Sequence, residues 1–284
     1  RDISGVGFVP DYLFIKNAGL AVGAVANVTE NYGDSTSYFT DTANLVNSIQ
    51  ALQTGGFQLG NEATYTANGS ASYTHYWAAF SGSSDTRSTS GTYKMATGTY
   101  TGNGGTYITV NDLDFKPDLV IVKGNVATAG VFRTSMMGGD WTAYLDSGTA
   151  DFQAGIVSLD AKGFTIGSSS IVNTNATNYY WTAYGNAWNP ETNSGAADFS
   201  IGAYYGNGID NRNITRQSFQ PNMVTVKRSG ASNGVFNTSS HTAGYSSFFA
   251  ATNEALDLIQ TFNSDGFQIG ATANVNTATA INWF

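Results

Sequence analysis

Short runs of apolar residues, closed off by glycine, asparagine or proline, dominate the chain. Residues 12–16 follow a Pro-Asp step and are mostly aromatic or β-branched, which is typical of a buried strand. Residues 57–59 lie between two glycines and alternate apolar with polar side chains, as a half-buried strand does. Residues 253–262 show near-helical spacing, but they form a single short stretch. The pattern predicts an all-β protein.

Three sequence blocks return about every hundred residues. The first centres on Pro10, Pro117 and Pro221, at intervals of 107 and 104 residues. The second is a Gly-Phe-x-Leu/Ile-Gly pentapeptide at residues 56–60, 163–167 and 266–270, and the third is an aromatic run at 76–80, 180–184 and, shortened, 281–284. This period is too long for a solenoid turn and suits a sandwich. We expect three tandem β-sandwich modules, Ig-like or jelly-roll-like, at residues 1–85, 92–188 and 197–284, with polar linkers over 81–91 and 186–197.

A fourth block is present in two modules and missing from the first. Residues 98–104 and 202–208 share the pattern Gly-x-Tyr-x-Gly-Asn-Gly, and each block starts 19 residues before its proline. Only nine residues precede Pro10. The first module is therefore predicted to lack its opening strand, which leaves an apolar edge that proteins normally cover.

The missing strand suggests self-assembly. A strand supplied by another copy of the chain would complete the first module by β-strand addition, and a head-to-tail contact that does not close propagates into a filament. The other reading is that the strand belongs to residues outside this chain. The apolar residues expected to take part in assembly lie near the two ends of the sequence: Ile3, Val6, Phe8, Trp283 and Phe284.

Composition narrows the classes of partner. Charged residues make up 11% of the chain and the net charge is −8, with the basic residues scattered singly. No basic stripe is present to neutralise phosphates, so we expect no nucleic-acid partner. No apolar run is long enough for a membrane span, so no membrane insertion is expected. The chain has no cysteine. Its uncharged polar surface favours an extracellular location, at a cell surface or a virion surface.

The sequence offers little for catalysis, and we expect neither enzymatic activity nor a cofactor or metal. His75 and His241 fall in different modules without neighbours at metal-ligand spacing. Asp112 and Asp114 are too few for a calcium site. Three lysines, Lys16, Lys123 and Lys227, end equivalent strands, where a cation at an edge discourages unwanted pairing. The acid after the proline is replaced by Asn222 in the third module, so the modules share no carboxylate there.

Aromatic pairs and glycosylation sequons add two further candidates for the surface. The pairs Tyr76-Trp77 and Tyr180-Trp181 are either core residues or platforms for stacking sugars, and their recurrence favours the core. Sequons for glycan attachment occur at five asparagines: Asn27, Asn68, Asn175, Asn213 and Asn237.

The pattern Phe-x-Pro-Asp-hydrophobic-x-hydrophobic-Lys, then Gly-Phe-x-Leu/Ile-Gly, then Tyr-Trp, resembles tandem modules of uncharacterised phage tail and fibre proteins and of bacterial surface proteins. The resemblance covers residues 8–283 and implies a β-sandwich scaffold without a defined ligand. By analogy of assembly, a module without a strand is similar to donor-strand bacterial pili. The expected function is a structural subunit of an extracellular, pilus-like filament. The alternative is a phage tail fibre or adhesin that binds host glycans.

Overall fold

The structure is a computed structural model, which describes residues 1–284 except 32, 63–66, 69–72, 83–92, 190, 193, 196 and 197. It is built almost entirely of antiparallel strands. This confirms the all-β fold class. We use first, second and third repeat for the described residues of 1–82, 93–189 and 198–284.

The second repeat shows the full arrangement of strands. Its larger sheet has the order β12-β11-β10-β15-β8 and its smaller sheet the order β13-β14-β9. The bounds are β8 (Lys94–Thr101), β9 (Ile108–Val110), β10 (Pro117–Gly124), β11 (Val131–Thr134), β12 (Ala143–Tyr144), β13 (Ile156–Asp160), β14 (Gly163–Ile166) and β15 (Asn178–Gly185). A buried cluster that includes Val120, Phe164 and Trp181 fills the space between the two sheets.

The third repeat follows the same order of pairing. Its sheets run β16-β24-β18-β19-β20-β21 and β17-β23-β22. The bounds are β16 (Ala203–Tyr205), β17 (Arg212–Thr215), β18 (Met223–Arg228), β19 (Val235–Thr238), β20 (Tyr245–Phe248), β21 (Ala255–Leu256), β22 (Ile259–Asn263), β23 (Gly266–Ile269) and β24 (Ile281–Trp283). The near-helical spacing of residues 253–262 therefore marks β21 and β22.

The first repeat has one strand fewer in its larger sheet. The sheets run β4-β3-β2-β7 and β1-β6-β5. The bounds are β1 (Asp2–Ser4), β2 (Tyr12–Asn17), β3 (Val25–Val28), β4 (Ser37–Tyr38), β5 (Ile49–Gln53), β6 (Gly56–Leu59) and β7 (His75–Phe80). Within the part of the chain that the structure describes, no strand takes the place beside β7 that β8 takes beside β15 and β16 beside β24.

Two single-turn helices, α1 (Ser170–Asn173) and α2 (Ala273–Asn276), precede the last strands of the second and third repeats. The sequence pattern did not predict them. Each has a buried valine and a buried asparagine at its end. The side chains of Asn173 and Asn276 each donate to the carbonyl of the glycine that follows the preceding strand, Gly167 and Gly270, at 2.9 Å. The helices therefore brace the turn into the last strand.

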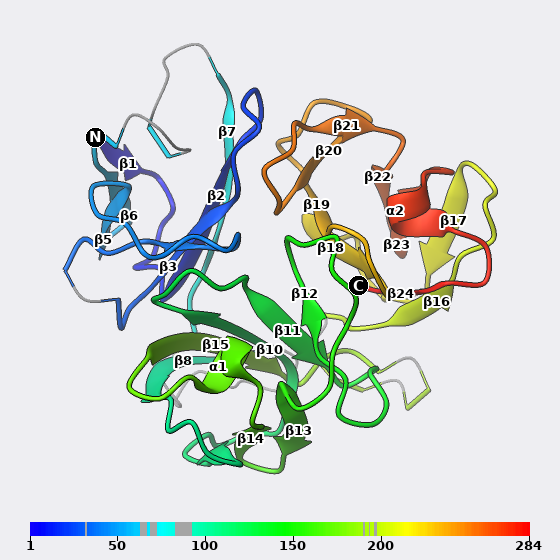
Figure 1. Cartoon of the computed structure of the whole chain (residues 1–284). Helices are drawn as coiled ribbons and strands as arrows, with labels where there is room; N and C mark the ends of the chain where they lie inside the picture. The colour runs from blue at the N-terminus through cyan, green and yellow to red at the C-terminus, as the bar shows by residue number, and fades with distance from the viewer. Residues whose placement is uncertain are drawn as a thin grey trace.

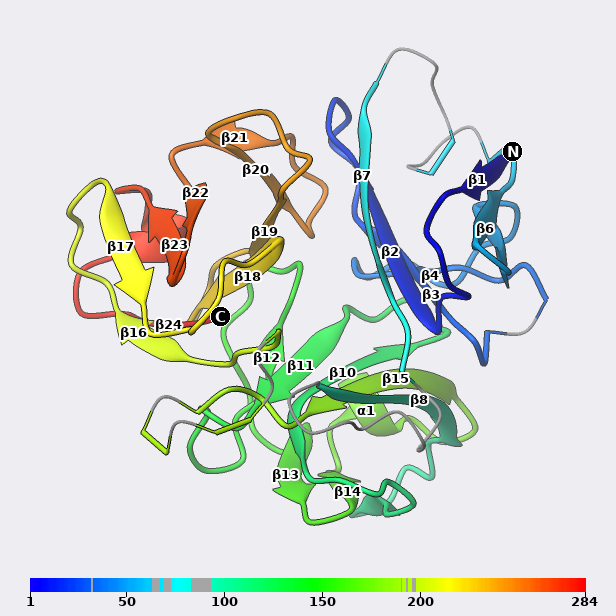
Figure 2. The same cartoon turned by 180° about the vertical axis from the view of Figure 1, so that it is seen from behind.

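The repeats share a core in addition to their own. One buried cluster takes side chains from the outer faces of all three larger sheets, and it includes Phe14, Tyr76, Phe132, Tyr180, Phe236 and Trp283. Figures 1 and 2 show the repeats grouped around this centre, the first in blue, the second in green and the third in yellow to red. The chain therefore does not fold as a string of separate modules.

A ring of backbone hydrogen bonds closes this centre. Each repeat donates one amide to the carbonyl of its neighbour: Ala24 to Phe249 at 2.8 Å, Gly130 to Phe39 at 2.6 Å and Gly234 to Leu145 at 2.7 Å. Within each repeat the return bond runs between the same positions: Phe39 to Ala24 at 3.0 Å, Leu145 to Gly130 at 3.0 Å and Phe249 to Gly234 at 3.1 Å. The six bonds form a closed circuit, so each repeat contacts both others.

Candidate functional site

The last strand of each repeat carries two aromatic residues that face opposite sides of the sheet. Tyr76, Tyr180 and Trp283 occupy equivalent positions opposite the three strand lysines and belong to the shared core. The next residues, Trp77, Trp181 and Phe284, meet a phenylalanine of the smaller sheet edge-on, at centroid distances of 5.4, 5.3 and 5.2 Å. The core interpretation of the aromatic pairs is thus borne out for Tyr180 and Trp181. The third repeat uses Trp-Phe in place of Tyr-Trp.

A covering strand shields the second aromatic residue in two of the repeats. Gly98 of β8 lies against the ring of Trp181, where a Cβ atom would come within 2.3 Å of the ring, and Gly202 lies in the same way against Phe284 at 2.1 Å. Two residues further on, Tyr100 and Tyr204 each donate a hydrogen bond of 2.7 Å to the carbonyl of Val172 or Val275. The Gly-x-Tyr motif therefore fits a strand to the aromatic residue beneath it.

In the first repeat, the second aromatic residue of the last strand is partly exposed. Trp77 is 39% exposed, whereas Trp181 is 4% exposed. The carbonyls of Thr74 and Phe80 accept hydrogen bonds from the amides of Ala18 and Asp11, on the β2 side. Because successive backbone groups of a strand point to opposite sides, the amides and carbonyls of the odd-numbered residues of β7 point away from β2.

The free edge of β7 is therefore defined by His75, Trp77 and Ala79. Among the described residues, no strand pairs with this edge. The edge combines backbone groups that have no strand partner in the described part of the chain with an exposed indole, which is the combination that a sheet presents to an incoming strand. It is the site that we consider for assembly.

The residues that the sequence proposed for assembly are engaged within the chain's own fold. Ile3 lies in β1 opposite Phe57, and Val6 packs on the same core. Phe8 is half-buried between β1 and β2. Trp283 and Phe284 close the third repeat, where Phe284 exchanges two backbone hydrogen bonds with Gly202. The edge that the structure leaves without a strand partner among the described residues is instead that of β7, whose aromatic pair the sequence analysis read as core residues or as a platform for sugars.

The three equivalent lysines are buried, so their expected role as edge cations is wrong. Their ammonium groups reach loop carbonyls, and two of them cross to a neighbouring repeat: Lys16 binds the carbonyl of Ala250 at 3.1 Å, and Lys123 that of Thr42 at 3.2 Å. Lys16 also donates to the carbonyl of Val22. Burial lowers the pKa of Lys16, Lys123 and Lys227 to about 8 each. The lysines therefore connect neighbouring repeats, whereas the sequence suggested cations at exposed strand edges.

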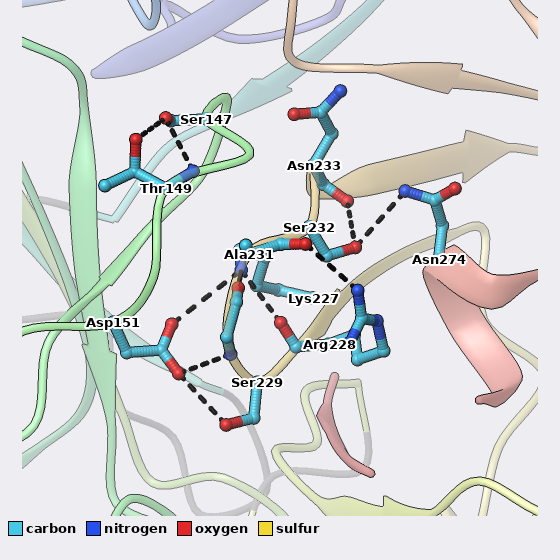
Figure 3. A network of polar contacts seen from close by, with 11 residues as sticks. Ser147, Thr149, Asp151, Lys227, Arg228, Ser229, Ala231, Ser232, Asn233 and Asn274 are labelled. Carbon is cyan, nitrogen blue, oxygen red and sulfur yellow. Dashed lines mark hydrogen bonds and ion pairs between the residues drawn. The ribbon is translucent and has the colours of Figure 1, made fainter. Parts of the chain in front are cut away.

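The third lysine meets a carboxylate of the second repeat (Figure 3). Lys227 Nζ lies 3.8 Å from an oxygen of Asp151 and donates to the carbonyls of Arg228 and Gly230 at 2.8 and 2.9 Å. The same carboxylate accepts from the Ser229 hydroxyl at 3.0 Å and from the Gly230 amide at 2.8 Å. The network ties the turn after β18 to the loop after β12, so it serves the contact between repeats.

The two histidines also have structural partners. His241 stacks on Tyr76 with a centroid distance of 3.6 Å and accepts or donates hydrogen bonds with Thr238 and Ser247. Its burial lowers its pKa to about 4. His75 bonds the side chain of Asn17 at 3.1 Å. Within the described ranges, no group of three or more His, Cys, Asp or Glu side chains is placed to hold a metal ion.

The asparagines of the predicted glycosylation sequons differ in their burial. Asn27 and Asn237 are buried in β3 and β19, and their side-chain amides donate to backbone carbonyls, including that of Ile259 at 2.8 Å for Asn237. A glycan on either nitrogen is incompatible with this fold, which corrects the prediction there. Asn68 donates to the carbonyl of Gly60. Asn175 and Asn213 are exposed and remain predicted positions for glycan attachment.

Comparison with known proteins adds no relative: no protein-family model, curated protein or solved structure matches the chain. No helix in the described part of the chain is long and apolar enough to cross a membrane.

Proposed function

We propose that the chain is a structural subunit of an extracellular filament, and that another copy of the chain adds a strand to the free edge of β7. The observation that carries this proposal is the difference between equivalent strands. β15 and β24 each have a covering strand, whereas β7 shows none among the described residues and leaves Trp77 open. Extended strands bind such edges through backbone hydrogen bonds and fill pockets with alternate side chains.

The closed ring of repeats supports an assembly of whole subunits. The shared core and the six ring hydrogen bonds occupy the faces through which separate modules would stack. Contacts between copies therefore have to use surfaces that the shared core leaves open, and β7 is the last strand of its sheet, on the side toward the third repeat (Figure 1). A strand-to-edge contact joins two different surfaces, and contacts of this kind extend into open filaments unless they close into a ring.

The chemistry of the surface agrees with this role. The net charge of −8 and the absence of a basic stripe favour no nucleic-acid partner. The motifs that recur in the repeats serve packing, the covering of aromatic rings and contacts between repeats. We therefore assign no catalytic residue, and the partners of the proposed filament are other copies of the chain.

The experiment replaces Ala79 by proline, which removes an amide that points away from β2. Proline is tolerated at a strand edge but not where the amide is paired. We expect Ala79→Pro to abolish assembly, seen by sedimentation velocity and negative-stain images, while the single subunit keeps its unfolding temperature. Trp77→Lys, which places a charge at the edge, should act in the same way.

The matched control is Ala183→Pro, at the equivalent position of β15, where β8 occupies the edge. This change removes an internal hydrogen bond and should destabilise the subunit by about 1 kcal/mol or more. A wild-type protein that stays a single subunit at high concentration, or an Ala79→Pro variant that assembles normally, would overturn the proposal.

A second candidate function is glycan binding by an adhesin. The exposed indole of Trp77 favours it, because aromatic faces next to polar groups commonly stack on sugars. A glycan array separates the two functions. Binding that is lost in Trp77→Ala and kept in Ala79→Pro would favour the adhesin, since stacking needs the ring and not the backbone amide.

A further inference from the structure

The junction between the second and third repeats holds an amine and a carboxylate that are almost fully enclosed. The side chains of Lys227 and Asp151 are 1% and 8% exposed, and Nζ of the lysine lies 3.8 Å from Oδ1 of the aspartate. Among the described residues, the other two strand lysines have no carboxylate in ion-pair contact. The positions equivalent to Asp151 hold Asn44 and Glu254, which also come directly before the residue that bridges back across the loop.

The two oxygens of Asp151 have different surroundings (Figure 3). Oδ2 accepts hydrogen bonds from the Ser229 hydroxyl at 3.0 Å and from the Gly230 amide at 2.8 Å. Oδ1 is buried, and no hydrogen bond reaches it from the described residues, so the ammonium of Lys227 is the polar group that it faces. Two donors on one oxygen are the arrangement that stabilises negative charge during acyl transfer. The site thus holds one oxygen in place and leaves the other to the amine.

Burial also changes the reactivity of the amine. Desolvation lowers the pKa of Lys227 to about 8, although the charge of Asp151 acts in the opposite direction. The neutral amine is the nucleophilic form, and a closed site keeps out competing water. Hydrogen bonds of 2.8 and 2.9 Å to the carbonyls of Arg228 and Gly230 fix Nζ beside the carboxylate. Groups held in this way react at a high effective concentration.

We propose that Lys227 and Asp151 condense into an amide that cross-links the third repeat to the second. A proton passes from Nζ to Oδ1, and the neutral amine then attacks Cγ. The Nζ–Cγ bond forms while Oδ2 carries the negative charge between the Ser229 hydroxyl and the Gly230 amide. Oδ1 takes a second proton from Nζ and leaves as water when the Cγ–Oδ1 bond breaks. The ammonium and the carboxylate supply every atom, so the reaction needs no oxidant and no further reactant.

The cross-link is a covalent brace within one chain. The chain has no cysteine, so no disulfide can take this role. Like a disulfide, the bond restricts the unfolded chain and thereby stabilises the folded one. The unlinked chain has three buried strand lysines with ammonium groups, and the linked chain has two. The bond does not depend on strand addition at β7, so either proposal can fail without the other.

The test follows the mass of the whole chain after it is refolded from urea. We expect the mass to fall by that of one water molecule as the bond forms. Cyclisation at Asp265-Gly266 would also release water, so a tryptic digest locates the change. Trypsin does not cleave after an acylated lysine, and the expected product is therefore residues 134–162 joined to residues 217–228.

Three variants separate the bond from an ordinary ion pair. Lys227→Arg keeps a cation opposite Asp151 but removes the nucleophilic amine, so it should fold and keep its full mass. Ser229→Ala removes one donor to Oδ2 and should slow bond formation about tenfold or more, with the same final product. Lys123→Arg, at the equivalent lysine without a carboxylate in contact, is the matched control and should give the linked peptide as the wild type does.

Two results would contradict the proposal. One is a folded wild-type chain that keeps its full mass and releases residues 134–162 and 217–227 as separate peptides. The other is a linked peptide that persists in Lys227→Arg, because the bond would then use another amine.

Discussion

At the scale of single residues, equivalent positions in the three repeats contact different partners. The lysine at the end of β2, β10 and β18 is buried each time and holds loop carbonyls, although its partners differ. The acid after the proline accepts the amide of the chain leaving the last strand, in Asp11 from Gly82 and in Asp118 from Ala187. The third repeat has Asn222 there.

The buried lysines predict a rise in stability with pH. Their pKa values are about 8 in the folded chain, and near 10.4 in an unfolded one. Between pH 8 and about pH 9.5 the unfolded state therefore binds more protons, so the free energy of unfolding increases as pH rises. Urea titrations at several pH values measure this slope.

Lys123→Met should reduce that slope by roughly a third and destabilise the fold by about 1–3 kcal/mol at pH 7, because the carbonyls of Thr42, Gly124 and Val126 lose their donor. Lys162→Met, at an exposed lysine, is the control and should change neither quantity. A slope that is the same in both variants would show that the buried ammonium groups do not titrate in this range.

At the scale of strands, the covering strand decides how much the second aromatic residue contributes to stability. Trp181→Ala should cost about 3–5 kcal/mol, because the ring is enclosed by Phe164 and Gly98. Trp77→Ala should cost markedly less in the single subunit, because its ring is 39% exposed. Chemical denaturation of the two variants measures the difference. Equal costs would mean that the edge of β7 is already covered in the single subunit.

Much of this level could be predicted from the sequence. The blocks around Pro10, Phe57 and Tyr76 gave the strands of the larger and smaller sheets, because each strand shows its burial in its own residues. The block at residues 98–104, which has no counterpart among residues 1–9, indicated which strand has no equivalent in the described part of the first repeat. Trp283 was harder to place, since it follows only two residues of β24 and aligns with tyrosine, a substitution that only the pairing with Lys227 reveals.

Other features were out of reach of the sequence because they depend on how the repeats close on each other. The lysines looked like exposed strand ends, but Lys16 and Lys123 each bond one loop carbonyl that lies more than 80 residues away in the sequence. The sequon asparagines Asn27 and Asn237 looked like surface positions, although their amides support neighbouring loops. No local sequence pattern indicates that these lysines and asparagines are buried, since their burial depends on tertiary contacts.

At the scale of the whole molecule, a shared core and a closed ring of hydrogen bonds join the three repeats. We expect a single calorimetric unfolding transition, since the shared core and ring bonds couple each repeat to both others. Gly234→Val should lower the temperature of that one transition, because a Cβ atom would lie 2.5 Å from the carbonyl oxygen of Leu145. Gly138→Val, with open space around it, is the control. Separate transitions would argue against the ring.

Hydrogen exchange at the free edge of β7 tests the proposed assembly most directly. The account predicts that the amides of Trp77 and Ala79 exchange fast in the single subunit and slowly in the assembled protein, while those of Trp181 and Ala183 exchange slowly in both. Equal exchange of Trp77 and Ala79 before and after assembly would contradict it.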